Sequence, residues 1–142
     1  HDTVYGTGIA EIQAIHDADR TAITDIDVQG VDEYKQFSQN VIAIFLLPPS
    51  YDEWRRRLRV RYASEAEFDT EWPKRFRSAI KELTHALEVP YYHFIINNDL
   101  SETVRIAREI ANRPDLYNRK DDEARLAARD LLSKLLEMGQ LQ

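Results

Sequence analysis

Two acidic residues close a β-branched run near the start of the chain. Asp25 and Asp27 lie in the segment TAITDIDV (21–28), and Gly30 follows. Residues two apart on a strand point to the same face, and ligands of open α/β sheets bind outside the carboxyl ends of the strands. Carboxylates placed there can hold hydrated Mg²⁺ or accept hydrogen bonds from ribose and base donors. A polar turn before Gly30 accounts for the same residues without a ligand.

Arginines are concentrated in the middle of the chain. Arg57 and Arg61 are four residues apart, so on a helix they project from one face, where guanidinium groups can bind phosphate oxygens in pairs. The chain has 19 Lys+Arg against 25 Asp+Glu, a net charge of −6, so this gathering favours a local phosphate site. Ion pairs with the neighbouring glutamates are the alternative, namely Glu53, Glu65, Glu67 and Glu71. The run comprises Arg55, Arg56, Arg57, Arg59 and Arg61, followed by Lys74, Arg75 and Arg77.

A polar group follows the apolar run HFII (93–96). The side-chain amide of Asn97 offers a donor and an acceptor, as needed to bind the edge of a base. One of Asn97, Asp99 and Ser101 is expected to cap the helix that comes next.

The elements that would position these groups alternate along the chain. Strands are expected over 21–28, 41–47 and 93–96, and the second is apolar nearly throughout, which is typical of a parallel strand covered on both faces. The order predicts an α/β fold with a parallel sheet. Helices are expected around Ile9 to Ile15 after a Thr7 cap, after a Ser50 cap, and over 74–87, 101–111 and 121–138, with a surface excursion over 62–71.

Composition narrows the class of protein. A chain of 142 residues with 43% hydrophobic residues suits one domain. It has no cysteine, its longest apolar run (41–48) is too short to cross a bilayer, and its four histidines lack metal-ligand spacing. We therefore expect a cytoplasmic protein without a membrane or nucleic-acid partner.

Five segments, taken together, resemble the guanylate kinase family and occur in its order. Tyr5-Gly-Thr7 resembles the GMP-contacting Tyr-Gly-Ser/Thr, and Arg57-Leu-Arg-Val-Arg61 resembles the Arg-Leu-x-x-Arg that begins the lid. The other three are Asp25-Ile-Asp-Val-Gln-Gly30, Phe45-Leu-Leu-Pro-Pro-Ser50 and Ile96-Asn-Asn-Asp-Leu100.

The resemblance implies a parallel-sheet core of the P-loop nucleoside-triphosphate hydrolase kind, with helices on both faces and a lid region over 55–77. It implies ATP-dependent phosphorylation of GMP, with Mg²⁺ as cofactor. The implied roles are catalytic for Arg57, Arg61 and Arg75, GMP binding for Tyr5, Thr7 and Asp27, adenine binding for Asn97, and Mg²⁺ binding, directly or through water, for Asp25.

The chain also departs from the family. Tyr62 stands where a glycine follows the second lid arginine, Pro73 lies in a lengthened lid, and Tyr92 and Asn98 replace aspartates. No Gly-x-x-x-x-Gly-Lys-Ser/Thr loop is present in the given sequence. We therefore expect an incomplete, inactive fragment of the kinase domain that lacks the N-terminal strand and phosphate loop. Unpaired sheet edges in such a fragment predict a homo-oligomer or strand-swapped dimer. The alternative is a protein-interaction module of the same fold without kinase activity.

Overall fold

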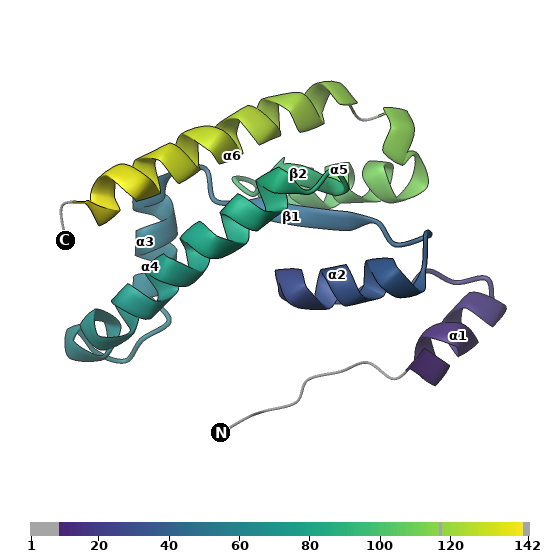
Figure 1. Cartoon of the computed structure of the whole chain (residues 1–142), viewed down its shortest axis with the longest axis horizontal. Helices are drawn as coiled ribbons and strands as arrows, with labels where there is room; N and C mark the ends of the chain where they lie inside the picture. Colours follow the sequence, from purple (N-terminus) through teal and green to yellow (C-terminus); the bar gives the residue numbers. More distant parts are fainter. Residues whose placement is uncertain (1–8, 117, 141–142) are drawn as a thin grey trace.

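The computed structural model describes residues 9–116 and 118–140. Helices form most of this part of the chain, around a small parallel sheet (Figure 1). In chain order the elements are α1 (Ile9–Asp17), α2 (Val28–Phe37), β1 (Ala43–Leu47), α3 (Tyr51–Arg59), α4 (Glu65–Glu88), β2 (Tyr92–Ile96), α5 (Leu100–Asn112), a 3₁₀ turn η1 (Pro114–Leu116) and α6 (Asn118–Gly139).

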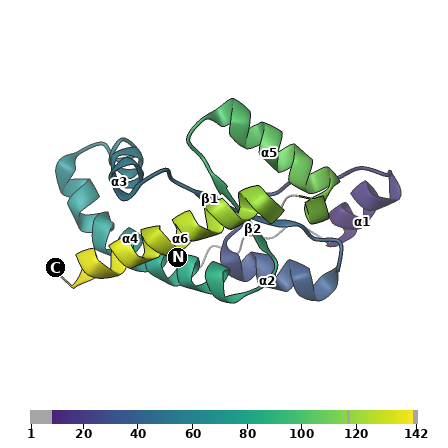
Figure 2. The ribbon, with the colours of Figure 1, turned by 90° about the horizontal axis from the view of Figure 1, so that it is seen from above.

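The sheet consists of β1 and β2, paired in parallel from Ala43 opposite Tyr92 to Leu47 opposite Ile96. Side chains of β2 alternate between two covered faces, as expected for a buried parallel strand. Tyr92 and Phe94 belong to a core with residues of α4 and α6, while Ile95 is buried on the other face, where α5 contacts the strand. Figure 2 shows α5 to one side of the strands. The predicted parallel arrangement and the helices on both faces are confirmed for these two strands.

The strand predicted over 21–28 is wrong. Residues 20–27 have no regular structure, and α2 begins at Val28. Ile23 is 96% exposed, so this segment packs against no sheet. Extended backbone is stabilised as a strand only beside another strand that accepts its hydrogen bonds, and in the described part of the chain β2 is the one strand paired with β1.

Two predicted helix caps are confirmed. The Ser50 hydroxyl accepts a hydrogen bond from the Glu53 backbone N–H at 3.2 Å and begins α3. The Asp99 carboxylate does the same for α5, accepting from the Glu102 N–H at 2.8 Å. The helix predicted over 121–138 corresponds to α6, and the Thr7 cap lies outside the described residues.

Residues 62–71 lie mostly at the surface, as predicted, but the expected helix start at Lys74 is wrong, because α4 begins at Glu65 and most of this segment is helical. The Ser64 hydroxyl accepts from the Glu67 N–H, and the Glu67 carboxylate accepts from the Ala63 N–H at 2.9 Å. This reciprocal pair resembles a capping box and supplies partners for the free N–H groups of the first turn. Pro73 is accommodated inside the helix.

The first half of α4 packs on α3 through aromatic rings, at one end of the molecule (Figures 1 and 2). Trp72 is central: its ring centroid lies 5.1 Å from that of Trp54, 5.3 Å from Phe68 and 5.6 Å from Phe76. These tilted contacts extend the main core, which includes Phe76 and against which Trp54 and Trp72 pack. Among the described helices, none combines the length and apolar character that crossing a membrane requires.

Candidate functional site

Arg57 joins α3 to the carboxyl end of β2. Its Nη1 donates a hydrogen bond to the backbone carbonyl of Asn97 at 2.8 Å, and its Nε donates to the Glu53 carboxylate at 2.6 Å. Of the predicted site residues, Arg57 and Asn97 are therefore brought into direct contact, although 40 positions separate them. The contact lies at the strand end, where open α/β sheets bind ligands.

The Asn97 side chain is held from α5. Its Oδ1 accepts a hydrogen bond from the Thr103 hydroxyl at 3.1 Å, and that hydroxyl also lies 2.8 Å from the Asp99 carbonyl. Thr103 is buried, at 6% exposure. The one hydrogen of the Thr103 hydroxyl is shared between these two acceptors, and the amide nitrogen of Asn97 makes no hydrogen bond with the described residues, so it is available as a donor to a ligand. Thr103 was not among the predicted residues. It could have been found from its position, because it lies six residues after Asn97 in the first turn of α5.

Glu53 was predicted as an ion-pair partner of the arginine run and not as a site residue. Hydrogen bonds from Arg56 and then from Arg57 lower the pKa of the Glu53 carboxyl to about 2, so it is ionised at neutral pH. The ion-pair interpretation of the arginine run is thus confirmed for Arg56 and Arg57, and also for Arg59, whose Nε lies 2.5 Å from a Glu65 carboxylate oxygen. The signal for Glu53 was its spacing of four residues before Arg57.

The other two predicted arginines differ in their surroundings. Arg75 Nε donates to the Tyr62 hydroxyl at 3.2 Å across the loop between α3 and α4. Arg61 is exposed and makes no hydrogen bond or ion pair with any described side chain. The structure does not bring Arg61 into contact with Arg57 or Arg75.

Asp27 lies at the N-terminus of α2. Its carboxylate accepts a hydrogen bond from the Gly30 N–H at 2.8 Å and caps α2, so a helix cap stands where a polar turn at the end of a strand was the alternative to a ligand site. Burial and, next, the charge of Asp27 raise the pKa of Glu82 on α4, while Arg75 opposes that rise. Asp27 and Arg75 are therefore both within electrostatic range of Glu82, a residue that we did not predict. Tyr5 and Thr7 lie outside the described residues.

Asp25 is exposed and has no hydrogen-bond partner among the described residues. The same part of the chain contains no group of three or more His, Cys, Asp or Glu side chains that could hold a metal ion. Mg²⁺ in phosphoryl-transfer sites is commonly held by one or two carboxylates, with waters and substrate phosphates completing its coordination. A single free carboxylate at Asp25 fits that donor set.

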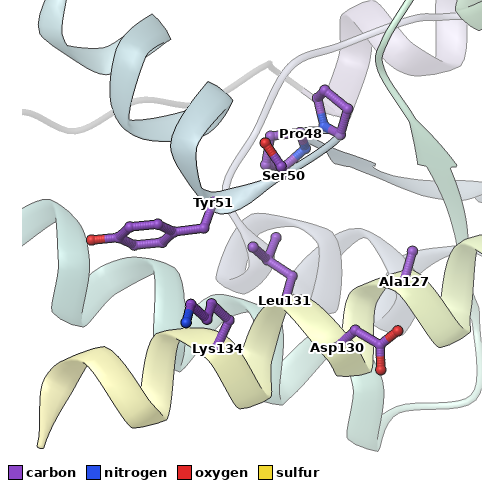
Figure 3. Close-up of a pocket in the computed structure, with 8 residues that line it drawn as sticks. Pro48, Ser50, Tyr51, Ala127, Asp130, Leu131 and Lys134 are labelled. Atoms are coloured by element: carbon purple, nitrogen blue, oxygen red, sulfur yellow. The ribbon is translucent and has the colours of Figure 1, made fainter.

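A cavity of about 270 Å³ lies elsewhere, between the turn that follows β1 and helix α6 (Figure 3). Its lining includes Pro48, Ser50, Tyr51, Leu131 and Lys134 and contains none of the predicted nucleotide-binding residues. The candidate site is therefore the carboxyl end of β2 with its neighbours on α3, rather than this cavity.

Comparison with known proteins identifies the family. The family model described as Guanylate kinase matches residues 1–113. A guanylate kinase 1 of Oryza sativa subsp. japonica is 31% identical over 123 residues, covering 86% of this chain and 31% of that protein. Guanylate kinases of Syntrophotalea carbinolica and Alkalilimnicola ehrlichii are 34% and 33% identical, over 78% and 90% of this chain and 50% and 61% of theirs.

The chain therefore spans about half the length of these bacterial relatives. No solved structure gave a significant match. The family match covers the acidic motif of residues 25–30, the arginine segment and Asn97 together. This chain belongs to the guanylate kinase family.

Proposed function

We propose that the protein containing this chain transfers the γ-phosphoryl group of ATP to GMP and releases ADP and GDP. The family match over residues 1–113 carries this proposal. In the reaction, a phosphate oxygen of GMP forms a bond to the γ-phosphorus of ATP, and the bond from that phosphorus to the β–γ bridging oxygen breaks. Such transfer depends on positioning and charge neutralisation more than on a covalent side chain.

The arginines supply the positive charge. Arg57, Arg61 and Arg75 are proposed to hold the transferring phosphates with their guanidinium groups, within a lid formed by residues 55–77. The hydrogen bond from Arg57 to the Asn97 carbonyl supports this assignment, because it fixes one guanidinium at the strand end. Asn97 is proposed to bind adenine through its amide nitrogen.

The acidic motif and the opening loop are proposed to bind GMP. Asp27 would accept hydrogen bonds from GMP, next to contacts from Tyr5 and Thr7. Asp25 would hold Mg²⁺ directly or through water, and the bound ion would neutralise phosphate charge. We also propose that the protein is cytoplasmic.

The given sequence contains no Gly-x-x-x-x-Gly-Lys-Ser/Thr loop, so the 142 residues alone are proposed to lack turnover. The test is a coupled ADP-release assay on the full-length protein with GMP, AMP, CMP or UMP as acceptor. We expect turnover that depends on GMP. Arg57→Ala should reduce kcat by roughly 100-fold or more, as expected when a charge-stabilising group is removed. GMP binding without ADP release would instead indicate an interaction module, and the kinase proposal would then fail.

A further inference from the structure

Tyr62 lies in the loop between α3 and α4, and its hydroxyl contacts the guanidinium of Arg75, which is proposed to hold phosphate. Arg75 Nε donates a hydrogen bond to this hydroxyl at 3.2 Å. We propose that Tyr62 is a positioning residue that orients the Arg75 guanidinium for phosphate binding. The inference rests on the proposed function and extends it to a residue that none of the family motifs contains.

Two contacts hold Tyr62 in place. Its ring packs edge-on against Phe68, with centroids 5.8 Å apart, and Phe68 is 1% exposed. Its backbone carbonyl accepts a hydrogen bond from Arg59 Nη1 at 3.4 Å, and Arg59 is paired with Glu65 at the start of α4. The hydroxyl is therefore presented from a side chain that is anchored at both its ring and its backbone.

The chemistry of this partner suits an arginine that must bind an anion. The hydroxyl accepts the hydrogen bond of the Nε–H group. The two terminal nitrogens of Arg75 make no hydrogen bond with the described residues, so both can donate to phosphate oxygens. Arg57, by contrast, is paired with the Glu53 carboxylate. A neutral hydroxyl fixes the orientation of Arg75 without cancelling its charge, and orientation before binding reduces the entropy lost on forming the complex.

Steady-state kinetics of the full-length protein, with ADP release as the signal, test this role. Tyr62→Phe keeps the ring on Phe68 and removes only the hydroxyl. We expect kcat to fall roughly 3- to 10-fold, the effect of losing one solvent-exposed hydrogen bond, with KM for GMP nearly unchanged. Tyr51→Phe is the matched control, because Tyr51 belongs to the same aromatic core and its hydroxyl makes no hydrogen bond within the described structure.

A double-mutant cycle separates this inference from the proposed function. Arg75→Lys keeps the positive charge but removes Nε and the planar guanidinium with its paired N–H donors. Tyr62→Phe should have no further effect in the Arg75→Lys background. If Arg75→Lys impairs the enzyme and Tyr62→Phe does not, or if Tyr62→Phe acts equally in both backgrounds, the positioning role is overturned while the proposed function stands. Absence of GMP-dependent ADP release by the unaltered protein overturns both.

A measurement without substrate checks the contact itself. Hydrogen exchange of arginine Nε–H groups can be followed by ¹⁵N nuclear magnetic resonance. The Arg75 Nε–H should exchange more slowly than that of Arg77, which is exposed and makes no hydrogen bond with the described residues, and Tyr62→Phe should remove the difference. Equal exchange of the two groups in the unaltered protein would contradict the inference.

Discussion

The carboxylate of Asp32 connects three parts of the chain. It accepts hydrogen bonds from the Tyr91 hydroxyl and from His85 Nε2, the latter at 3.0 Å. Asp32 lies on α2, His85 on α4, and Tyr91 immediately before β2. This carboxylate therefore ties α2, whose N-terminus carries Asp27, to the helix that carries Arg75.

Replacing Asp32 with asparagine is expected to destabilise the protein in a pH-dependent way. Burial alone would raise the pKa of Asp32, but the hydrogen bonds from Tyr91 and His85 outweigh it and leave the pKa below its usual value of 3.8. A lowered folded-state pKa means that the ionised carboxylate stabilises the fold above about pH 4, and that this contribution is lost as the pH falls through the lowered pKa.

Urea unfolding of Asp32→Asn and of the unaltered protein measures this difference. At about pH 7 we expect a loss of about 1 kcal/mol in the free energy of unfolding, discounted for solvent screening. The discount applies because the Asp32 and His85 side chains are 34% and 32% exposed. At about pH 3 the gap should narrow. Asp69→Asn, at an exposed site without partners in the described structure, is the control, and a gap independent of pH would contradict the prediction.

At the scale of elements, Pro73 interrupts the backbone hydrogen bonding of α4. It lies in the interior of the helix and is exposed, so its ring contributes little packing. A proline there lacks the N–H that would bond the carbonyl of Asp69 and crowds that carbonyl. We expect Pro73→Ala to raise the free energy of unfolding by about 1–3 kcal/mol.

Thermal or urea unfolding compares this variant with Ser78→Ala, which also adds a good helix former at an exposed position of α4 but restores no backbone hydrogen bond. The expected gain for Ser78→Ala is about 0.5 kcal/mol. If Pro73→Ala gives no more than that, the missing hydrogen bond is not what limits this helix.

The elements also show what the sequence can and cannot predict. Caps depend on a few neighbouring residues, so Ser50 and Asp99 could be identified from the chain alone. The start of α4 depends on equally local signals, Ser64 followed by Glu67, and the prediction of a start at Lys74 did not take them into account. The predicted strand over 21–28 failed because strand formation depends on a neighbour elsewhere in the chain.

The site residues, too, could be predicted only where the signal lies in neighbouring residues. Asp27 and the arginine run were visible as local patterns, and so was Glu53 as an ion-pair partner of that run. The hydrogen bond from Arg57 to the Asn97 carbonyl joins positions 40 apart. It exists because parallel β1 and β2 end together, which no local pattern specifies.

At the scale of the whole molecule, the sheet is the least protected feature. Among the described residues β1 pairs with β2 alone, so its other edge presents unpaired backbone groups. Apolar side chains remain exposed on and before this strand: Leu46 is 51% and Ile42 39% exposed. An open edge with apolar neighbours favours pairing with another chain.

We therefore predict that the 142-residue chain self-associates through β1, as a homo-oligomer or strand-swapped dimer. Sedimentation velocity over a range of protein concentrations should show an average mass that rises with concentration. Leu46→Lys should shift the protein toward the monomer, because a charged side chain on an edge strand opposes further pairing. Leu126→Lys is the matched control, since Leu126 on α6 is similarly exposed, at 57%, but lies on no strand. A chain that stays monomeric and unfolds cooperatively at every concentration would contradict the prediction, and an equal effect of both lysines would place the contact elsewhere than β1.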